Sequence, residues 1–388
     1  ITSIYEILEK RFNVIVQRIA SFTFLFTRVL ADAVRFAAIA IVIQSITSLS
    51  ITLSIIVVGL VTLIYTVLGG LKTIIHIDAL QFFIYILSAF ICIFSLLSFI
   101  DAPINDIFLD LNNLNKLKII DFTGNMFTKP FMFISAFLGG MMLSFASHGA
   151  DYMMVQRVLA TKDISSANKA MIGSGIFVFF QFSLFLLIGS LIYLASDGQL
   201  IKKDQEMSYV ILNILPIGFK GIVIAGVLSA AMSTLSSSIN ALSSSLIKDW
   251  LPNLKSLQLS RLISVFWTVV LILTAIIFQN SEDALVIIGL KIASFTYGSL
   301  LSFFILSKFE EKFETLSIII GYIFGILTVF YFIEFNIAWT FYILGSVLVN
   351  IFIVLILQKT KKISIVKYVL IILAIFSFFN LLNAQEKE

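Results

Sequence analysis

The sequence predicts an all-α integral membrane protein with about eleven membrane-spanning helices. Of its 388 residues, 60% are hydrophobic and only 12% are charged, whereas soluble domains carry about 25% charged residues to solvate their surfaces. Long apolar stretches such as 51–68, 85–100 and 176–195 approach the ~20 residues that cross a bilayer as a helix. They lack the polar–apolar alternation of a membrane β-barrel. We therefore expect a helical bundle in the lipid bilayer.

Apolar windows divide the chain into these spans, with polar connections between them. The longest stretches without a span are 101–130 and 196–217, which are polar enough to lie outside the hydrocarbon. The expected spans are 18–45, 50–70, 73–100, 131–157, 168–195, 219–246, 259–279, 285–307, 315–333, 337–358 and 365–383.

The charges predict an orientation. Residues 1–17 are expected to form an amphipathic cytoplasmic loop, because Lys and Arg are concentrated in the loops on that side of the membrane. An odd number of spans then places the C-terminus outside. The chain starts at Ile1 without a methionine or a signal-peptide pattern, so we expect that the natural N-terminus is missing. The net charge of +4 is explained by these loops and needs no nucleic-acid partner.

The most unusual expected helix contains the sequence LSAAMSTLSSSIN at 228–240. The small residues at 230, 233, 234 and 237 are spaced so that they share one helix face. Their hydroxyls and the nearby backbone carbonyls are oxygen ligands, which a hard cation such as sodium prefers. The alternative is tight helix packing through small residues, which the spacing alone favours.

Asp78 is the second candidate, because it lies near the start of the expected span 73–100. A carboxylate in a spanning segment is costly and by default indicates an ion or proton pathway. The alternative is a residue close to the cytoplasmic interface that water solvates, since only about two helical turns separate it from Gly69-Gly70.

The third candidate is the polar run SFASHGADYMMVQR at 144–157, flanked by glycines within an apolar span. Interrupted helices near the middle of the membrane are where transporters expose backbone to substrates and ions. Alternatively, Gly139-Gly140 is a packing notch and Gln156-Arg157 a cytoplasmic cap. His148 is not expected to hold a metal, because the only other histidine is His76 and no cysteine is nearby.

These segments, in this order, resemble the sodium:solute symporter family of sugar, sialic acid, proline and monocarboxylate carriers. The matching stretches are YTVLGGLKTIIHIDALQFF (65–83), SHGADYMMVQR (147–157), SAAMSTLSSSINA (229–241) and ASFTYGSLL (293–301). The resemblance implies a LeuT-type inverted-repeat bundle of five plus five helices with additions. It would form a single domain over 1–388, N-terminally incomplete, with core helices in 18–307 and accessory helices in 308–388.

The resemblance also implies sodium as the bound ion and assigns two sodium sites. The carbonyl of Ala230 with Ser233 and Thr234 would form half of the main site, and the first core helix, which this chain lacks, would supply the rest. Some family members hold a second sodium with an aspartate and further serines. Asp78, Ser236 and Ser237 match that pattern, which favours ion binding over packing for the serine helix.

Substrate residues are harder to assign. Arg28, Asp32 and Arg35 share one face of the first span, and Asp32 can pair with one arginine. The remaining positive charge then needs a reason. Either backbone carbonyls close a buried polar network, or Arg35 meets a substrate carboxylate.

Five further residues are substrate candidates. The resemblance places Ser144, Ser147 and His148 on the substrate-facing part of the interrupted helix. Gln181 either lines the cavity or bonds a neighbouring helix, and Lys291 either faces the substrate or extends toward the membrane surface. Together these residues favour an anionic organic solute over a neutral sugar.

The sequence therefore predicts sodium-coupled symport of a small organic solute by alternating access. Lysine outnumbers arginine 20 to 6 and isoleucine is abundant, which is typical of an AT-rich bacterial genome, so we expect the protein in a bacterial inner membrane. The HExxH pattern and paired carboxylates of an enzyme and the GxxxxGK[ST] loop of a nucleotide-driven pump are absent from the sequence. A channel pore does not need interrupted helices. The alternatives are a transporter-like membrane sensor, although no soluble domain follows 365–388, or an inactive fragment.

Overall fold

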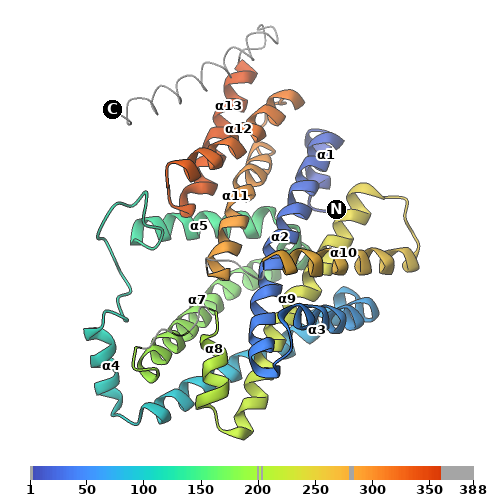
Figure 1. Ribbon diagram of the computed structural model, residues 1–388. Helices are drawn as coiled ribbons and strands as arrows, with labels where there is room; N and C mark the ends of the chain where they lie inside the picture. Colours follow the sequence, from blue (N-terminus) through green and yellow to red (C-terminus); the bar gives the residue numbers. More distant parts are fainter. Residues whose placement is uncertain (1–2, 199–200, 202–203, 279–283, 360–388) are drawn as a thin grey trace.

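The computed structural model describes residues 3–198, 201, 204–278 and 284–359, without the side chains of 68–73. This described part is built from helices and contains no strand (Figure 1). The elements are α1 (Glu6–Arg11), α2 (Val14–Thr47), α3 (Ile51–Ile100), α4 (Ile104–Asn113), α5 (Phe133–Ala150), α6 (Tyr152–Leu159), α7 (Ile164–Ala195), α8 (Glu206–Tyr209), the π-helical η1 (Val210–Ile214), α9 (Ile217–Trp250), α10 (Leu257–Phe278), α11 (Leu285–Leu306), α12 (Thr315–Glu334), the 3-10 helix η2 (Trp339–Phe341) and α13 (Tyr342–Lys359).

Most of the expected spans are present. Within the described residues, nine helices are long and apolar enough to cross a bilayer. Together with the shorter apolar stretch Ile51–Val67, they correspond to the first ten expected spans. The eleventh, at 365–383, lies outside the described residues.

Helix α3 changes direction between Tyr65 and Asp78. A straight helix would separate these residues by about 20 Å. Their partners on α9, Met232 and Ser237, are only about 8 Å apart along that helix. Two segments of α3 therefore lie against the same part of α9, as the two expected spans require. The contacts are Tyr65 OH to Met232 O (2.5 Å), Ser237 Oγ to Asp78 Oδ2 (3.2 Å) and Ser88 Oγ to Ile222 O (3.0 Å).

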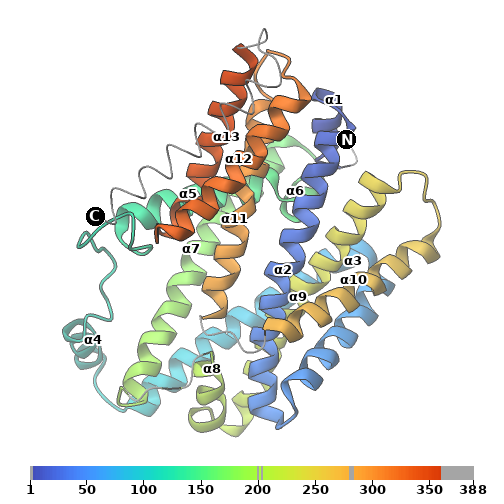
Figure 2. The same cartoon turned by 45° about the horizontal axis from the view of Figure 1, so that its top comes forward.

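The centre of the bundle is formed by α2 and α9, which cross between α3, α10 and α11 (Figure 2). In the most apolar windows of α2 and α9, 50% of the residues are buried, against 17% in α7, which therefore lies at the periphery. Gly226 lets α9 approach α3 closely, because a Cβ at this position would overlap the Ser88 side chain. The pair α12 and α13 packs beside α11 at the top of Figure 1.

The interruption considered for the expected span 131–157 is present, because the structure divides this span into α5 and α6 at Asp151. The backbone of Asp151 is extended, and its carboxylate accepts hydrogen bonds from the N–H groups of Met153 (2.9 Å) and Met154 (3.3 Å). A short acidic side chain favours such an N-cap over a helix interior. Gly139 lies inside α5 and packs against Thr340, so it is a packing notch.

The polar connections also contain helices that the sequence did not predict. The described residues 3–17 contain α1 and the first turn of α2, and Asn13 caps α2 by accepting from the N–H of Ile15 (2.9 Å). The connection 101–130 contains α4, and 196–217 contains α8 and η1. These segments are too short for the apolar windows that identify spans.

Candidate cation site and buried charge network

The residues expected to form a second sodium site lie on α3 and α9, and a third element, α6, adds Arg157 to them. Asp78 Oδ2, on α3, accepts hydrogen bonds from Arg157 Nη2 of α6 (2.6 Å) and from Ser237 Oγ of α9 (3.2 Å). The same Nη2 also donates to Ser237 Oγ. The Asp78 side chain is 14% exposed and that of Arg157 36%, so this ion pair is not sealed inside the protein.

The surroundings of Asp78 are rich in oxygen. Ser236 and Ser237 are buried, and Ser236 Oγ donates to the carbonyl of Ser233 (3.1 Å). Within the described part of the chain, Asp78 Oδ1 and Gln81 Oε1 are buried without a hydrogen-bond partner. A carboxylate, hydroxyls and an amide oxygen are the hard ligands that alkali and alkaline-earth ions accept. These residues therefore fit a sodium ion.

The expected main sodium site is, by contrast, a patch on one helix. Ala230, Ser233 and Thr234 are half-buried on α9. Thr234 Oγ1 donates to the carbonyl of Ala230 (3.2 Å), which is the usual back-bond of a helical threonine. The three oxygens fit a share of a sodium shell, and they come from a single element.

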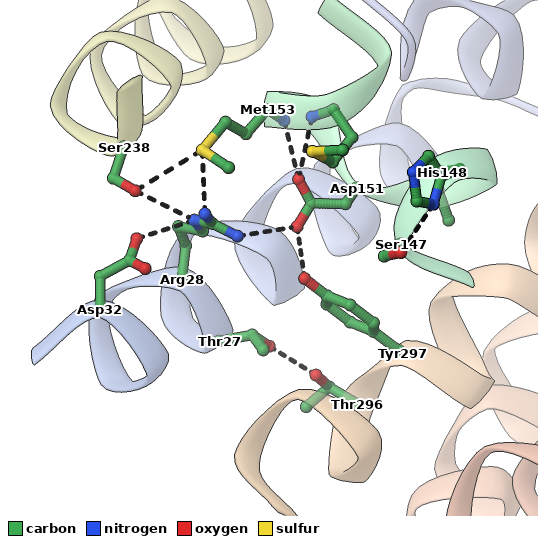
Figure 3. A network of polar contacts seen from close by, with 12 residues as sticks. Thr27, Arg28, Asp32, Ser147, His148, Asp151, Met153, Ser238, Thr296 and Tyr297 are labelled. Carbon is green, nitrogen blue, oxygen red and sulfur yellow. Dashed lines mark hydrogen bonds and ion pairs between the residues drawn. The ribbon is translucent and has the colours of Figure 1, made fainter. Parts of the chain in front are cut away.

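A buried charge network reaches the same helix, α9, at Ser238 (Figure 3). Arg28 of α2 forms ion pairs with Asp32 (2.7 Å) and with Asp151 (3.3 Å), and Tyr297 of α11 donates to Asp151. Arg35 pairs with the other oxygen of Asp32. The network thus contains two arginines and two aspartates. The expectation of an uncompensated positive charge is wrong, because Asp151, which is distant in sequence, lies against Arg28 and balances the second arginine.

Burial divides this network into a sealed part and an open end. The side chains of Arg28, Asp32 and Asp151 are 6%, 0% and 1% exposed, whereas Arg35 is 44% exposed. Arg28 also donates to Ser238 Oγ (3.2 Å) and contacts Met153 Sδ (2.9 Å). The sealed part therefore ties α2, α6, α9 and α11 together.

The substrate candidates of the interrupted helix lie together. Ser147 Oγ and His148 Nδ1 are 3.1 Å apart, and His148 Nδ1 lies 3.0 Å from the carbonyl of Ser144. These three residues occupy the last turns of α5, just before the break at Asp151. Ser144 is exposed, and Ser147 and His148 are half-buried.

The remaining candidates lie elsewhere. Gln181 Nε2 donates to Tyr85 OH (3.3 Å), so it joins α7 to α3, which was one of its two expected roles. Arg35 donates to Asp32, and Lys291 is exposed on α11. In the described structure, the hydrogen bonds of Arg35 and Gln181 do not reach the α5 group.

Comparison with known proteins identifies the family. The sequence model of the sodium:solute symporter family matches residues 2–325. The chain belongs to the sodium:solute symporter family. It is a multi-pass membrane protein of a transporter family, and the resemblance seen in the sequence motifs is confirmed.

Several curated relatives are sodium-coupled carriers. The sodium/iodide cotransporter of Homo sapiens is 26% identical over 344 residues, which are 83% of this chain and 52% of that protein. The sodium/sialic acid symporter NanT of Aliivibrio fischeri is 26% identical over 64% of this chain and 50% of that protein. Sodium-coupled monocarboxylate transporter 1 of Mus musculus is 30% identical over 66% of this chain and 44% of that protein. The chain spans about half the length of these relatives.

A solved structure shares the fold. It is a Na+-coupled sialic acid symporter in a substrate-bound outward-open state, described as revealing a novel Na+ site. The TM-score is 0.79 at 22% sequence identity, and the match covers 92% of this chain and 76% of that one. The expected LeuT-type helical bundle is thereby confirmed.

Proposed function

We propose that this chain is part of a carrier that couples the entry of sodium to the entry of a small organic solute by alternating access. The observation that carries the proposal is the meeting of Asp78 with Ser237, which lie 159 residues apart and on different helices. Apolar packing gives no reason to bring a carboxylate and a hydroxyl together inside a membrane bundle, because both are costly there. Sodium coordination gives such a reason.

Two sodium sites follow from this proposal. Ala230, Ser233 and Thr234 contribute to the main site, and Asp78, Ser236 and Ser237 form the second. One sodium ion moving down a tenfold gradient yields about 1.4 kcal/mol, plus about 2.3 kcal/mol at 100 mV. Two ions supply about 7 kcal/mol, and a monovalent anion that enters against 100 mV uses about 2.3 kcal/mol of it. The remaining ~5 kcal/mol is enough for roughly 10³- to 10⁴-fold accumulation of that anion. A carrier of this kind suits the uptake of scarce nutrients.

An anionic solute is the proposed substrate class. Relatives are named for iodide, sialic acid and monocarboxylates, which are anions at neutral pH. In this chain, Arg35 keeps an exposed guanidinium at the open end of the charge network, and Ser144, Ser147 and His148 provide hydrogen-bonding groups on α5. Gln181 and Lys291 remain substrate candidates at lower priority, because Gln181 is bonded to Tyr85 and Lys291 lies on an exposed surface.

The proposed location is the bacterial inner membrane, with residues 1–17 in the cytoplasm. Core helices would occupy 18–307 and accessory helices 308–388, and the family match over 2–325 includes the whole of this core.

Uptake into proteoliposomes tests the proposal. With an inward sodium gradient, we expect saturable uptake of a radiolabelled organic anion, accompanied by ²²Na+ and abolished when potassium replaces sodium. The Ser233→Ala/Thr234→Ala variant should lose this sodium dependence. Equal uptake in sodium and in potassium would contradict the proposal, and sodium flux without solute would indicate a channel instead.

A further inference from the structure

We propose that Arg157 is a tethered cation that competes with sodium for the Asp78 site, so that sodium binding there requires α6 to release α9. This inference rests on the proposed sodium-coupled function and adds the regulation of its second site.

Arg157 contacts two oxygen atoms that sodium would need. Its Nη2 contacts both Asp78 Oδ2 and Ser237 Oγ, which belong to the proposed sodium shell. A guanidinium nitrogen and a sodium ion cannot occupy the same position between these two oxygens. Binding of one therefore excludes the other.

Asp78 needs a cation nearby. Its side chain is only 14% exposed, and a carboxylate in a spanning helix is costly without a positive partner. Arg157, in contrast, is 36% exposed and can move its head group into water. An exchange of arginine for sodium keeps the carboxylate paired at every stage, which makes the exchange far less costly than simple loss of the arginine.

The contacts that hold the second half of α6 against α9 are weak. Beyond Arg157, this half contacts α9 through long polar interactions, and Gln156 and Asn240 are both half-buried. Contacts of this length are weak, and water can replace them. They are Gln156 Nε2 to Ser244 Oγ (3.4 Å) and Asn240 Nδ2 to Gln156 Oε1 (3.5 Å).

The start of α6 is different, because Asp151 is fixed by Arg28 and Tyr297 while its backbone is extended. The helix has one anchored end and one end held by exchangeable polar contacts. We infer that α6 pivots at Asp151 when sodium displaces Arg157 from Asp78.

Equilibrium binding of ²²Na+ to the purified chain is the first test. Arg157→Gln removes the competitor, so we expect sodium to bind the Asp78-dependent site roughly 5- to 30-fold more tightly, since affinity rises with the fraction of competent protein. Arg157→Lys should stay within about twofold of the parent, because it keeps a competing cation. Lys162→Gln is the matched control, since it removes an exposed positive charge nearby in sequence and should leave the affinity unchanged.

The gain should vanish in the Asp78→Asn background, because the contested site is then absent. Unchanged or weaker sodium binding by folded Arg157→Gln would overturn the inference. If the parent shows sodium-driven uptake at the same time, the proposed symport would stand while the tethered cation would not.

Cysteine alkylation provides a second test that keeps Arg157 in place. Cys92 is the only cysteine and is buried, so Cys92→Ala gives a background without thiols. Ser244 accepts a hydrogen bond from Gln156 of α6. We expect sodium to increase the alkylation rate of the thiol in Ser244→Cys several-fold. Ser243→Cys, which faces Ser264 of α10, is the control and should not respond. An identical sodium response at both positions, or no response at Ser244→Cys, would contradict the release of α6.

Discussion

The two ends of α6 hold two ion-pair networks of similar chemistry and opposite character. At its start, Asp151 meets Arg28 where the side chains are 1% and 6% exposed, and Tyr297 completes the shell. At its end, Arg157 meets Asp78 where they are 36% and 14% exposed, and one carboxylate oxygen has no hydrogen bond among the described residues. Burial, not residue type, separates the two networks.

This difference explains why only one network is suited to bind ions. Removing one partner of a buried ion pair is strongly destabilising, so the Arg28 network holds helices in place. A partly exposed pair is worth little on its own, because water screens it, so its partners can exchange. We therefore expect substitutions in the first network to lower the stability of the fold, and substitutions in the second network to change the affinity for sodium.

The largest expected effect is the loss of stability in Asp151→Asn. Asparagine can still cap α6, but Arg28 would lose one of its two carboxylates inside the bundle, which should cost about 3–5 kcal/mol of the free energy of unfolding. The midpoint of thermal unfolding in detergent measures this. Asp163→Asn is the control, because Asp163 caps α7 in the same way and is exposed. Equal midpoints for the two variants would show that the buried network is not structural.

The next effect concerns the close approach of α9 to α3 that positions Asp78. A methyl group at Gly226 would overlap Ser88, so Gly226→Ala should destabilise the protein by about 1–3 kcal/mol. Gly140→Ala is the matched control, since nothing lies within 4 Å of its Cβ position. It should be neutral or slightly stabilising, because alanine favours the helix. Equal effects would mean that the two helices do not meet at Gly226.

A smaller effect on stability is expected for Arg35→Gln, at the open end of the buried network. Asp32 would keep its pair with Arg28, so the free energy of unfolding should change by about 1 kcal/mol or less. If Arg35 meets the solute, the KM for an organic anion should rise roughly tenfold while the KM for sodium stays within about twofold, because a charged contact is worth about that much. An unchanged KM for the anion would remove Arg35 from the substrate site.

The smallest effect is the pH dependence of the α7 cap. The backbone N–H of Ser166 donates to Asp163 and lowers the pKa of that carboxyl below its ordinary value. The cap therefore contributes stability above the unfolded pKa of about 3.9 and loses it as the pH falls through the lower folded pKa. Hydrogen exchange of the first turn of α7 should accelerate only at acidic pH. Asp163→Asn should abolish that pH dependence.

The spans were predictable from sequence because apolar windows are local. The pairing of Asp78 with Ser237 was predictable only through the family resemblance, since 159 residues separate them and neither segment marks the other. Asp151 was in a recognised motif, yet its role depends on Arg28, 123 residues away. An interruption within 144–157 was predictable from its polar run and glycines, whereas its position at Asp151 depends on local capping chemistry.

The number of sodium ions coupled to uptake decides whether Asp78 and Ser237 form a sodium site. We predict that the sodium dependence of solute uptake has a Hill coefficient above one in the parent and near one in the Asp78→Asn/Ser237→Ala variant, with the Asp151 network intact in both. A coefficient that stays well above one in the folded variant would show that Asp78 and Ser237 do not form a sodium site.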